Sequence, residues 1–507
     1  MSLLLHCTIE KLIQGGRGLA RITSEGLSPS IPPSWVGRIV MVSGGVLPGE
    51  TVLCNLPEML SLSPKKAIEA SLVEVMTPST LRTTPVCAVH KLCGGCDWQH
   101  ITPEAQGIEK AAVFQETLKH LGGFASQEAL LPVLTTTPWH YRRHYQWHVC
   151  HPKTPLEKVT LGFKQRGSHE GIAYAHCHVL PQGAERLYTS LVQWLQTLPL
   201  TTQRLLHTVD VLWEASPESV PTIAIGCLST QTTPFKGWHT CMTQLAQHLQ
   251  KVSITLTGAY WHTSRHTCSP HTWGDTTFQR SIVWHDTHTT PTSHETKPHT
   301  LTISHQLHQF FQVHPQGLTH MLETLTRWYH QWQAMESFQS PSHVLYDVYA
   351  GVGVFGRWWL EMQQATGNLT TTHVVGVEAN QQSAIMAKKN WQLPEGTSPA
   401  STHFIAMPIE KALPLIQKQK KLPTPHVMVL DPPRAGLGET VKTWLLNPPR
   451  SLQHVVLISC DTATLARDLK VLLQGEPSPW VIQAIQPIDM FPQTHHLEAM
   501  VWLTRKP

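Results

Sequence analysis

Five short apolar runs near the C-terminus constrain the fold of this chain more than any other feature. They read "HVLYDVYA", "HVVGVEAN", "HVMVLDPP", "HVVLISCD" and "EAMVWLTR", and segments with helical patterns separate them. Short apolar runs that end in polar or turn-forming residues are typical of buried strands. Strands that alternate with helices build a mostly parallel sheet with helices on both faces. Residues 301–507 are therefore predicted to form a doubly wound α/β domain.

The rest of the chain has room for two more domains, since a domain holds roughly 100–200 residues and the chain has 507. Residues 1–76 alternate apolar stretches with Gly-Gly and Pro-Gly turns, which favours a small OB-type β-barrel. Such barrels often bind oligonucleotides, and a purely structural β-domain fits equally well. Residues 77–300 are expected to form a central α+β domain, whose helix at 97–124 packs on the C-terminal domain. Residues 285–299, rich in His, Thr and Pro, are predicted to be a surface loop.

Composition limits the class of protein. No apolar run is long enough for a transmembrane helix, and the N-terminus shows neither a basic segment nor a cleavage-like site, so a cytoplasmic protein without a membrane partner is expected. Eleven cysteines in such a chain argue against a disulfide framework and for metal binding or catalysis. A net charge of +4 says little about nucleic acid, because a local basic surface matters more than the total.

A glycine loop follows the first of the five runs. In "LYDVYAGVGVFG", Asp347 stands near the strand end, and Gly351 and Gly353 let backbone approach a ligand closely. Glu378 ends the next run, where an acidic residue suits the hydroxyls of a ribose. A tight strand-to-helix turn would also explain the glycines. The full G-x-G-x-x-G spacing is missing, and this half of the chain is instead similar to S-adenosylmethionine-dependent methyltransferases.

The third and fourth runs end in residues that suggest chemistry. "VLDPPRAGL" places Asp431 at a strand end before a stiff Pro-Pro turn. It resembles methyltransferases that act on base nitrogens, although those usually carry an aromatic residue where Arg434 stands. Cys460 follows the fourth run and is either a small buried residue or a nucleophile.

A cysteine at this position would suit methylation of a pyrimidine at carbon 5, which is a poor nucleophile. A thiolate added at carbon 6 makes an enolate, and carbon 5 can then attack a methyl donor. A base must afterwards remove the proton from carbon 5 so that the thiol is eliminated. Glu498 starts the last run and could face the same site, although a solvated glutamate at a strand end is ordinary.

Considered together, the motifs resemble one family. "FFQVH", "DVYAGVGVFG", "VLDPPRAGL", "SCDTATLARDL" and "DMFPQTHHLEAMV" stand in the order found in the bacterial RNA (uracil-5-)-methyltransferases, and the match covers most of the chain. The resemblance implies transfer of a methyl group from S-adenosyl-L-methionine to carbon 5 of a uridine in RNA. It implies that Cys460 is the nucleophile and Glu498 the base. It also implies a site for the cofactor and the target base, with these residues: Gln312, Tyr349, Glu378 and Asp431.

Four cysteines of the central region form a second pattern. "VCAVHKLCGGCDWQH" spaces Cys87, Cys93 and Cys96 as C-x5-C-x2-C, and Cys177 follows in "AYAHCHVL". Zinc sites with four cysteines more often use two C-x2-C pairs, and an iron–sulfur cluster fits this single pair at least as well. Four unrelated buried thiols are the remaining alternative.

The resemblance extends to one branch of the family. The ribosomal-RNA branch carries a four-iron four-sulfur cluster on the same cysteine motif and a TRAM domain of OB type in front, which "QGGRGLARI" and "VLPGETV" resemble. A monomeric enzyme acting on large-subunit ribosomal RNA is therefore expected. The alternatives are a tRNA substrate, an inactive RNA-binding relative and a base N-methyltransferase. Arg142 and Arg143, in a stretch like the family's Tyr-Arg segment, could contact RNA phosphates or form structural salt bridges.

Several positions depart from the family's usual residues. His314 and Pro408 stand where asparagine is usual, Val354 stands where a polar residue is common, and Asp461-Thr462 replaces a frequent Asn-Pro. These departures are expected to change contacts around the cofactor and to leave Cys460 and Glu498 unaffected.

Overall fold

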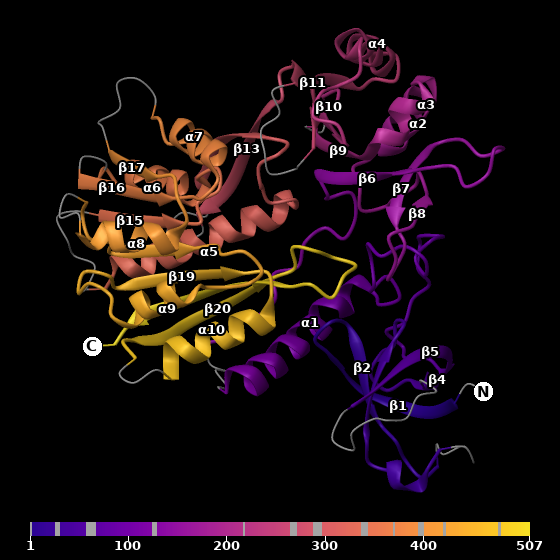
Figure 1. Cartoon of the computed structure of the whole chain (residues 1–507). Helices are drawn as coiled ribbons and strands as arrows, with labels where there is room; N and C mark the ends of the chain where they lie inside the picture. The colour runs from indigo at the N-terminus through magenta and orange to yellow at the C-terminus, as the bar shows by residue number, and fades with distance from the viewer. Residues whose placement is uncertain are drawn as a thin grey trace.

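A computed structural model describes residues 3–25, 31–56, 67–123, 129–215, 219–263, 271–286, 297–335, 343–368, 371–393, 400–418, 422–474 and 478–506. Within them the chain forms a small barrel, a central sheet with helices, and a large α/β unit (Figure 1). All five predicted strands of the C-terminal domain are present. The predicted combination of β-barrel, central α+β domain and doubly wound sheet is confirmed at the level of architecture.

The N-terminal residues close into a five-stranded barrel. Its order is β1-β2-β3-β5-β4, with β1 pairing antiparallel to β4 and β3 running parallel to β5. Alternate side chains of each strand point into one apolar core, as the two-residue period of a strand requires. The barrel is OB-like. Its elements are β1 (Leu3–Ile13), β2 (Arg17–Arg21), η1 (Pro33–Trp35), β3 (Ile39–Ser43), β4 (Thr51–Leu56) and β5 (Ile68–Thr77).

The central region contains a mixed sheet of order β12-β11-β10-β9-β6-β7-β8. Helices α2 and α4 cover one face of this sheet and bury its main apolar core. The other face of this sheet faces residues 307–313, which lead into the α/β unit. The elements are β6 (His144–Cys150), β7 (Thr160–Lys164), β8 (Gly171–Ala173), α2 (Ala184–Thr197), α3 (Leu200–Leu205), β9 (Leu206–Glu214), β10 (Thr222–Ser229), α4 (Trp238–Gln250), β11 (Thr255–His262) and β12 (His271–Gly274).

The α/β unit is built on a second sheet, of order β17-β16-β15-β18-β19-β21-β20. Strands β15 to β19 are parallel, and β21 is antiparallel to both β19 and β20. The inner parallel strands β15, β16, β18 and β19 are mostly apolar and buried because helices cover both faces, whereas the edge strand β17 is partly exposed. The elements are α5 (Pro315–Gln333), β15 (His343–Val348), α6 (Val354–Ala365), β16 (Thr372–Val377), α7 (Gln381–Asn390), β17 (Ser401–Ile405), α8 (Ile409–Lys418), β18 (Val427–Leu430), α9 (Glu439–Leu446), β19 (His454–Ser459), α10 (Thr462–Gln474), β20 (Trp480–Ile488) and β21 (Glu498–Arg505).

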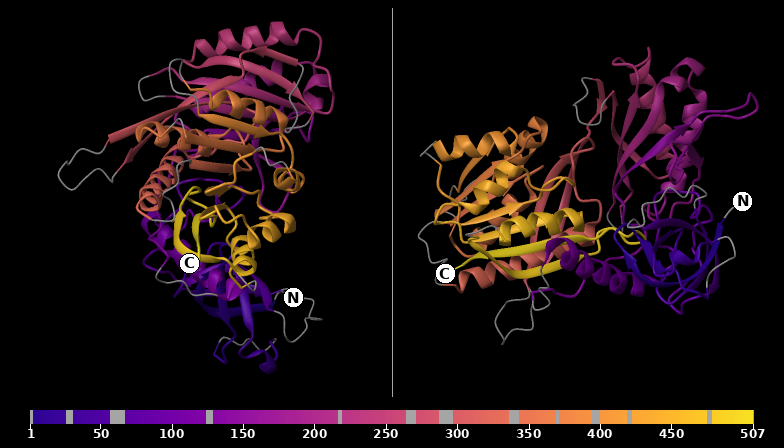
Figure 2. Two further views of the ribbon diagram at one scale, coloured as in Figure 1. Left: turned by 90° about the vertical axis from the view of Figure 1, so that its left-hand side faces the viewer. Right: turned by 60° about the horizontal axis from the view of Figure 1, so that its bottom comes forward.

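Two segments cross the predicted domain limits. The hairpin of β13 (Thr277–Asp286) and β14 (Lys297–Gln306) packs on α5, α6 and α7, so the limit predicted between residues 300 and 301 falls inside β14. Helix α1 (Pro103–Thr117), continued by the π-helix η2 (Leu118–Gly122), packs on α10, as expected for the helix predicted at 97–124. In the right-hand view of Figure 2, α1 (violet) lies beside the yellow C-terminal strands.

The loop predicted at 285–299 is wrong at both ends. His285 and Asp286 belong to β13, and residues 297–299 belong to β14; residues 287–296 lie outside the described residues. The strands continue because their inward side chains keep finding partners. His299 stacks on Trp284 with ring centroids 5.2 Å apart, and Asp286 accepts a hydrogen bond from His330 Nε2 at 2.7 Å.

Candidate active site

A cavity of about 630 Å³ lies at the carboxyl ends of the parallel strands, where open α/β sheets bind ligands. All six residues predicted for catalysis and for the cofactor or target base line it, although they come from separate motifs of the sequence. The lining contains His308, Phe310, Gln312, Tyr349, Gly351, Val377, Glu378, Ala379, Asn380, Ser383, Met407, Pro408, Ile409, Glu410, Asp431, Pro432, Pro433, Arg434, Cys460, Phe491 and Glu498.

Glu378 fixes the glycine loop at one side of the cavity. One carboxylate oxygen accepts a hydrogen bond from Gly351 N at 2.9 Å, and the other accepts one from Asn380 N at 2.7 Å. Asn380 in turn caps α7 by accepting from the backbone of Gln382 and Ser383. A carboxylate has about four lone-pair sites, so Glu378 keeps acceptor capacity for two hydroxyl groups of a ribose.

The loop between β15 and α6 is held in an unusual backbone conformation. Tyr349 has a φ of 60° and Gly353 a φ of 83°, and a Cβ on Gly353 would meet Trp391 Nε1 at 2.6 Å. A tyrosine in the left-handed region is strained, and such strain gathers at functional sites. Beneath the loop, Asp347 is fully buried and accepts a hydrogen bond from Gly356 N at 2.8 Å. Burial raises the pKa of Asp347 to about 8.

Cys460 follows directly on β19, and its neighbours fix its position. Asp461 Oδ1 accepts a hydrogen bond from Thr464 N at 2.8 Å and so caps α10, while Asp461 N donates to Ser459 Oγ. The thiol therefore stands between a buried strand and a capped helix. Burial, and to a lesser extent the nearby Glu498, raise the pKa of the Cys460 thiol to about 11, and the positive charge of Arg434 acts in the opposite direction.

Two carboxyl groups of the cavity are buried close together. Glu498 is 3% exposed, and its pKa is raised well above the ordinary value by burial and by the negative charge of Asp431. Burial also raises the pKa of Asp431 to about 7. Arg434 is the cation that opposes the raised pKa of Glu498, so one guanidinium acts on both the thiol and this carboxyl. A carboxyl group with a raised pKa is well suited to exchange protons near neutral pH.

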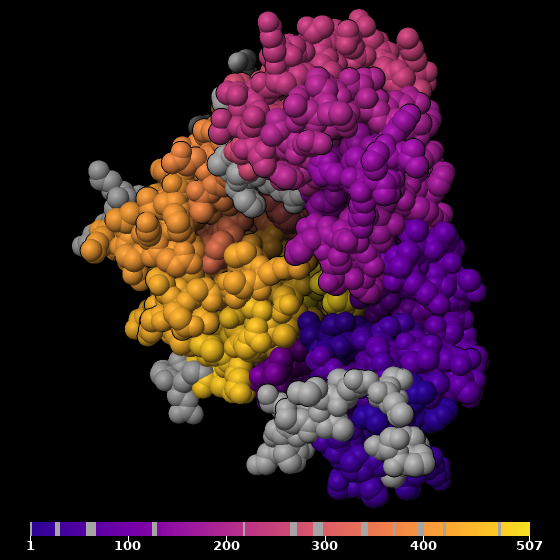
Figure 3. Space-filling view, turned by 45° about the vertical axis from the view of Figure 1, so that its right-hand side comes forward, coloured from indigo at the N-terminus to yellow at the C-terminus, as the bar shows by residue number. Residues whose placement is uncertain are grey.

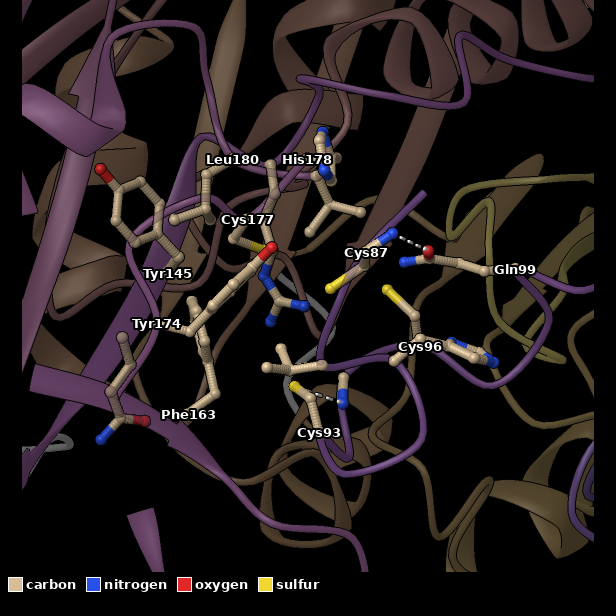
Figure 4. Close-up of a pocket in the computed structure, with 16 residues that line it drawn as sticks. Cys87, Cys93, Cys96, Gln99, Tyr145, Phe163, Tyr174, Cys177, His178 and Leu180 are labelled. Atoms are coloured by element: carbon tan, nitrogen blue, oxygen red, sulfur yellow. Dashed lines mark hydrogen bonds between the residues drawn. The ribbon is translucent and has the colours of Figure 1, made fainter. Parts of the chain in front are cut away.

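The four predicted cysteine ligands line a second cavity, of about 170 Å³. The side chains of Cys87, Cys93, Cys96 and Cys177 point into it from two loops of the central region (Figure 4). Gly95 N donates to Cys93 Sγ at 3.4 Å, and Gln99 Oε1 accepts from Cys87 N at 3.2 Å. The loop geometry thus turns thiols from distant parts of the sequence toward a common space.

Burial raises the pKa of three of these thiols, to about 12 for Cys96 and about 11 for Cys177. Neighbouring thiols of the set contribute to the rise, because each negative charge disfavours the next. A positive centre inside the cavity would relieve this repulsion. Among the described residues, however, no group of three or more His, Cys, Asp or Glu side chains is arranged closely enough to hold a single metal ion.

Comparison with known proteins gives a consistent result. The family model described as tRNA (Uracil-5-)-methyltransferase matches residues 418–506. The 23S rRNA (uracil(1939)-C(5))-methyltransferase RlmD of Shewanella sp. (strain ANA-3) is 27% identical, over 92% of this chain and 90% of the relative. An uncharacterized RNA methyltransferase of Parasynechococcus marenigrum is 28% identical, over 97% of this chain and 94% of the relative. This chain is therefore similar to RNA (uracil-5-)-methyltransferases over more than nine-tenths of its length.

The fold agrees with this family. The crystal structure of Pyrococcus abyssi tRNA (uracil-54, C5)-methyltransferase with S-adenosyl-L-homocysteine superposes with a TM-score of 0.61, over 98% of this chain and 99% of that chain, at 17% identity. The likeness extends over nearly the whole of both chains and so includes the barrel and the central sheet. Within the described part of the chain, no helix has the length and apolar character needed to cross a membrane.

The departures from the family's usual residues have structural explanations at two positions. His314 caps α5, where its Nδ1 accepts from Gly317 N at 3.3 Å, and its ring stacks on Tyr141. A histidine can therefore take over the capping role of an asparagine. Asp461 likewise caps α10. Pro408 lines the large cavity, and Val354 begins α6 beside the glycine loop; nothing in the structure explains why these two residues differ.

Some residues of the cavity were not predicted as site residues. Arg434 was noted only as a departure from a motif, although it acts on both Cys460 and Glu498. Phe310 and Phe491 provide aromatic surface in the cavity. Phe310 stands two residues before Gln312, and in an extended segment this spacing places both side chains on one face. Arg143 is largely buried near Glu214, which favours the structural alternative for that arginine.

Proposed function

We propose that this chain methylates carbon 5 of a uridine in large-subunit (23S) ribosomal RNA, with S-adenosyl-L-methionine as the methyl donor. The shared cavity of Cys460, Glu498 and Glu378 carries the proposal, because it brings a nucleophile, a base and a ribose-binding carboxylate together. The relatives named for 23S rRNA, which match over nine-tenths of the chain, support the choice of RNA. The enzyme is expected in the cytoplasm and as a monomer.

The chemistry assigns a role to each catalytic group. The Cys460 thiolate adds to carbon 6 of the uracil, which makes carbon 5 nucleophilic. S-adenosyl-L-methionine supplies the methyl group that carbon 5 then takes up. Glu498 removes the proton from carbon 5, the bond between carbon 6 and sulfur breaks, and the thiolate returns. Arg434 favours the thiolate form of Cys460 and the ionised form of Glu498, both of which the reaction requires.

The cofactor would lie across the glycine loop. Glu378 would accept hydrogen bonds from the ribose hydroxyls, and Tyr349 and Gln312 would line the path between the cofactor and the base. Asp431, at the end of β18, would face the polar edge of the uracil. A flipped uridine fits this arrangement, since an enzyme that acts on a base must take it out of the stack.

Replacement of Glu498 by glutamine tests the mechanism. Glu498→Gln retains the size of the side chain, so addition of Cys460 and methyl transfer should still occur, while elimination fails. We expect turnover to fall by about 10²–10⁴-fold and the methylated RNA to remain attached to the protein in denaturing electrophoresis. The double variant Cys460→Ala/Glu498→Gln should give no attached RNA. Normal turnover of Glu498→Gln without an adduct would remove Glu498 from the role of base.

We also propose that Cys87, Cys93, Cys96 and Cys177 hold a four-iron four-sulfur cluster and that the OB-like barrel is a TRAM domain that binds RNA. The four thiols that line one cavity support a metal centre, and the single C-x2-C pair fits a cluster at least as well as zinc. Cys87→Ser should remove iron, sulfide and the brown colour from anaerobically purified protein. Cys150→Ser, outside this cavity, is the matched control. Zinc without iron in the wild-type protein would contradict the cluster.

A tRNA substrate is the second candidate, which the description of the matching family model favours. The two candidates differ in where 5-methyluridine disappears when the gene is deleted. We expect the loss in large-subunit ribosomal RNA, mapped by mass spectrometry of RNA digests, with tRNA unchanged. A loss confined to tRNA would decide for the second candidate.

A further inference from the structure

A third cavity, of about 310 Å³, lies between the central sheet and residues 307–313, which lead into the active site. We call it the sheet cavity. It shares His308 and Phe310 with the active-site cavity, and it shares Arg142 and Gln146 with the cysteine cavity. In Figure 3 the central region (magenta) and the α/β unit (orange and yellow) form opposite sides of a hollow. RNA that brings a uridine into the active site would pass this position.

The strand register explains how polar groups gather on this face. Gln146 on β6 pairs with Asp210 on β9, Asp210 pairs with Gly226 on β10, and Gly226 pairs with Tyr260 on β11. The four residues therefore form one row across four strands, and His144 lies two residues from Gln146 on the same face. Gly226 contributes no side chain to the row. The space beside it is filled by its neighbours, since a Cβ there would meet Tyr260, His262 and Leu307 at 3.1 Å.

A polar row in the middle of a sheet is costly unless its groups are hydrogen-bonded. Asp210 is only 7% exposed, and its Oδ2 lies 3.5 Å from His262 Nε2, so the row contains a buried carboxylate that can still accept hydrogen bonds. Within the described residues, Gln146 Nε2 and His308 Nε2 are buried and have no hydrogen-bond partner. Two such groups in residues that line one cavity indicate that a polar ligand forms the missing hydrogen bonds.

We propose that the sheet cavity binds a guanine base of the RNA, unstacked beside the target uridine; this inference rests on the proposed function. Guanine alone among the four bases presents two adjacent N–H donors, at N1 and N2, which match the two oxygens of Asp210. Its O6 and N7 are acceptors for Gln146 and Arg142. Phe310, which is 66% exposed at the boundary with the active site, offers a surface on which a base can stack.

The first test uses the RNA. Each guanosine near the methylated uridine is replaced singly by inosine, which lacks the N2 amino group. For the wild-type full-length protein, one replacement should raise KM about tenfold, the usual scale for a lost hydrogen bond to a charged group. Asp210→Asn should remove this discrimination, since the two changes affect one contact. Asp275→Asn, the same change on an exposed turn of the central region, should retain it. Equal KM for every inosine RNA, or unchanged discrimination in Asp210→Asn, would overturn the inference.

The second test does not depend on methylation. Binding of guanosine 5′-monophosphate and of adenosine 5′-monophosphate to the full-length protein is followed by ligand-observed NMR. We expect a preference for the guanine nucleotide that Asp210→Asn abolishes and Asp275→Asn retains. Absence of that preference in the wild type overturns the guanine site, whatever the protein methylates. A retained preference without methyl transfer to any RNA would instead overturn the proposed function and leave the guanine site in place.

Discussion

At the scale of single residues, Arg434 acts on both of the groups proposed to be catalytic, Cys460 and Glu498. Burial raises the pKa of Cys460 to about 11 and raises that of Glu498, and both shifts favour the protonated forms. The guanidinium of Arg434 opposes both shifts. Arg434 is therefore the group that favours the ionised forms of the thiol and of the carboxyl against the effect of burial.

Replacement of Arg434 by glutamine should slow the reaction of Cys460 with iodoacetamide. Without the positive charge the pKa of the thiol is higher, so the thiolate fraction is lower at every pH below it, by roughly threefold to tenfold. The rate is measured between pH 7 and 10 on the peptide that contains Cys460. Arg434→Lys retains a charge and should lie closer to the wild type. Identical rates in the glutamine variant would show that Arg434 does not act on the thiol.

Three residues that line the cavity, Cys460, Asp431 and Glu378, could be predicted from the sequence because each stands at the end of an apolar run, whereas Gln312, Tyr349 and Glu498 were indicated by the resemblance to the family. Cys460, Asp431 and Glu378 follow strands that are parallel, so their side chains meet at one edge of the sheet. His308 and Phe310 follow no such run, and their place beside the central sheet depends on contacts between distant segments. The polar row with Asp210 depends on the register of four strands, which no local pattern of the sequence determines.

At the scale of elements, helix α1 secures the segment that carries Glu498. Lys110 and Asp489 form a buried ion pair at 2.6 Å, and Lys110 Nζ also donates to Phe491 O at 3.1 Å. Gln106 bonds to Gln493 on the same segment. Burial outweighs the mutual attraction on both sides of the ion pair, because the pKa of Lys110 is lowered and that of Asp489 is raised. The ion pair therefore fixes the position of the segment before Glu498 more than it stabilises the folded protein.

Lys110→Met should destabilise the protein by about 3–5 kcal/mol, because it leaves a buried carboxylate without its partner. The double variant Lys110→Met/Asp489→Asn removes the unpaired charge and should recover most of that loss. Urea unfolding followed by tryptophan fluorescence measures both. The double variant should still turn over more slowly than the wild type, since the segment before Glu498 has lost a tether. A double variant no more stable than Lys110→Met would contradict this account.

Helices and strands were predicted well where a single apolar pattern marks them in the sequence. They were predicted less well where a strand pairs with a segment that is distant in the sequence. The five strands of the C-terminal sheet follow from their apolar runs. The mixed sheet of the central region does not, because its neighbouring strands come from segments as far apart as β6 and β9. The same holds for the hairpin of β13 and β14, whose His- and Thr-rich sequence suggested a loop while burial of Trp284 and His299 maintains the strands.

At the scale of the whole molecule, buried histidines in several regions share one property. Burial lowers the pKa to about 4 for His100, His144, His314 and His496, and to about 3 for His454. These histidines remain neutral in the folded protein and take up protons on unfolding at acid pH. Asp347 and Asp431 act in the opposite sense, because their raised pKa values, about 8 and about 7, keep them protonated in the folded protein at mildly acid pH, where the unfolded carboxyls are ionised.

The free energy of unfolding should therefore be greatest near pH 6.5–7. Below the ordinary histidine pKa of about 6.5, the unfolded chain binds more protons at the histidines, so their contribution to stability is lost as pH falls toward 4. The buried carboxyls have folded pKa values above their unfolded ones. Their contribution is complete below about pH 4 and is lost as pH rises through 7 and 8. Urea unfolding at a series of pH values measures the curve, and a maximum below pH 5 would contradict the assignment.

The variant Asp347→Asn tests how much one buried carboxyl contributes to the dependence of unfolding free energy on pH. Asparagine retains an oxygen that can accept the hydrogen bond from Gly356 N, and it has no proton to lose. The loss of stability as pH rises from about 6.5 to 8 should become shallower in this variant, because the folded state no longer retains a proton that the unfolded carboxyl has already released. The acid limb should become steeper, since Asp347 no longer offsets the protons that the histidines of the unfolded chain take up between about pH 4 and 6.5. The measurement is made without S-adenosylmethionine, whose binding would stabilise the folded state by itself. If the alkaline limb of Asp347→Asn matched that of the wild type, the raised pKa of Asp347 would not be the source of that limb.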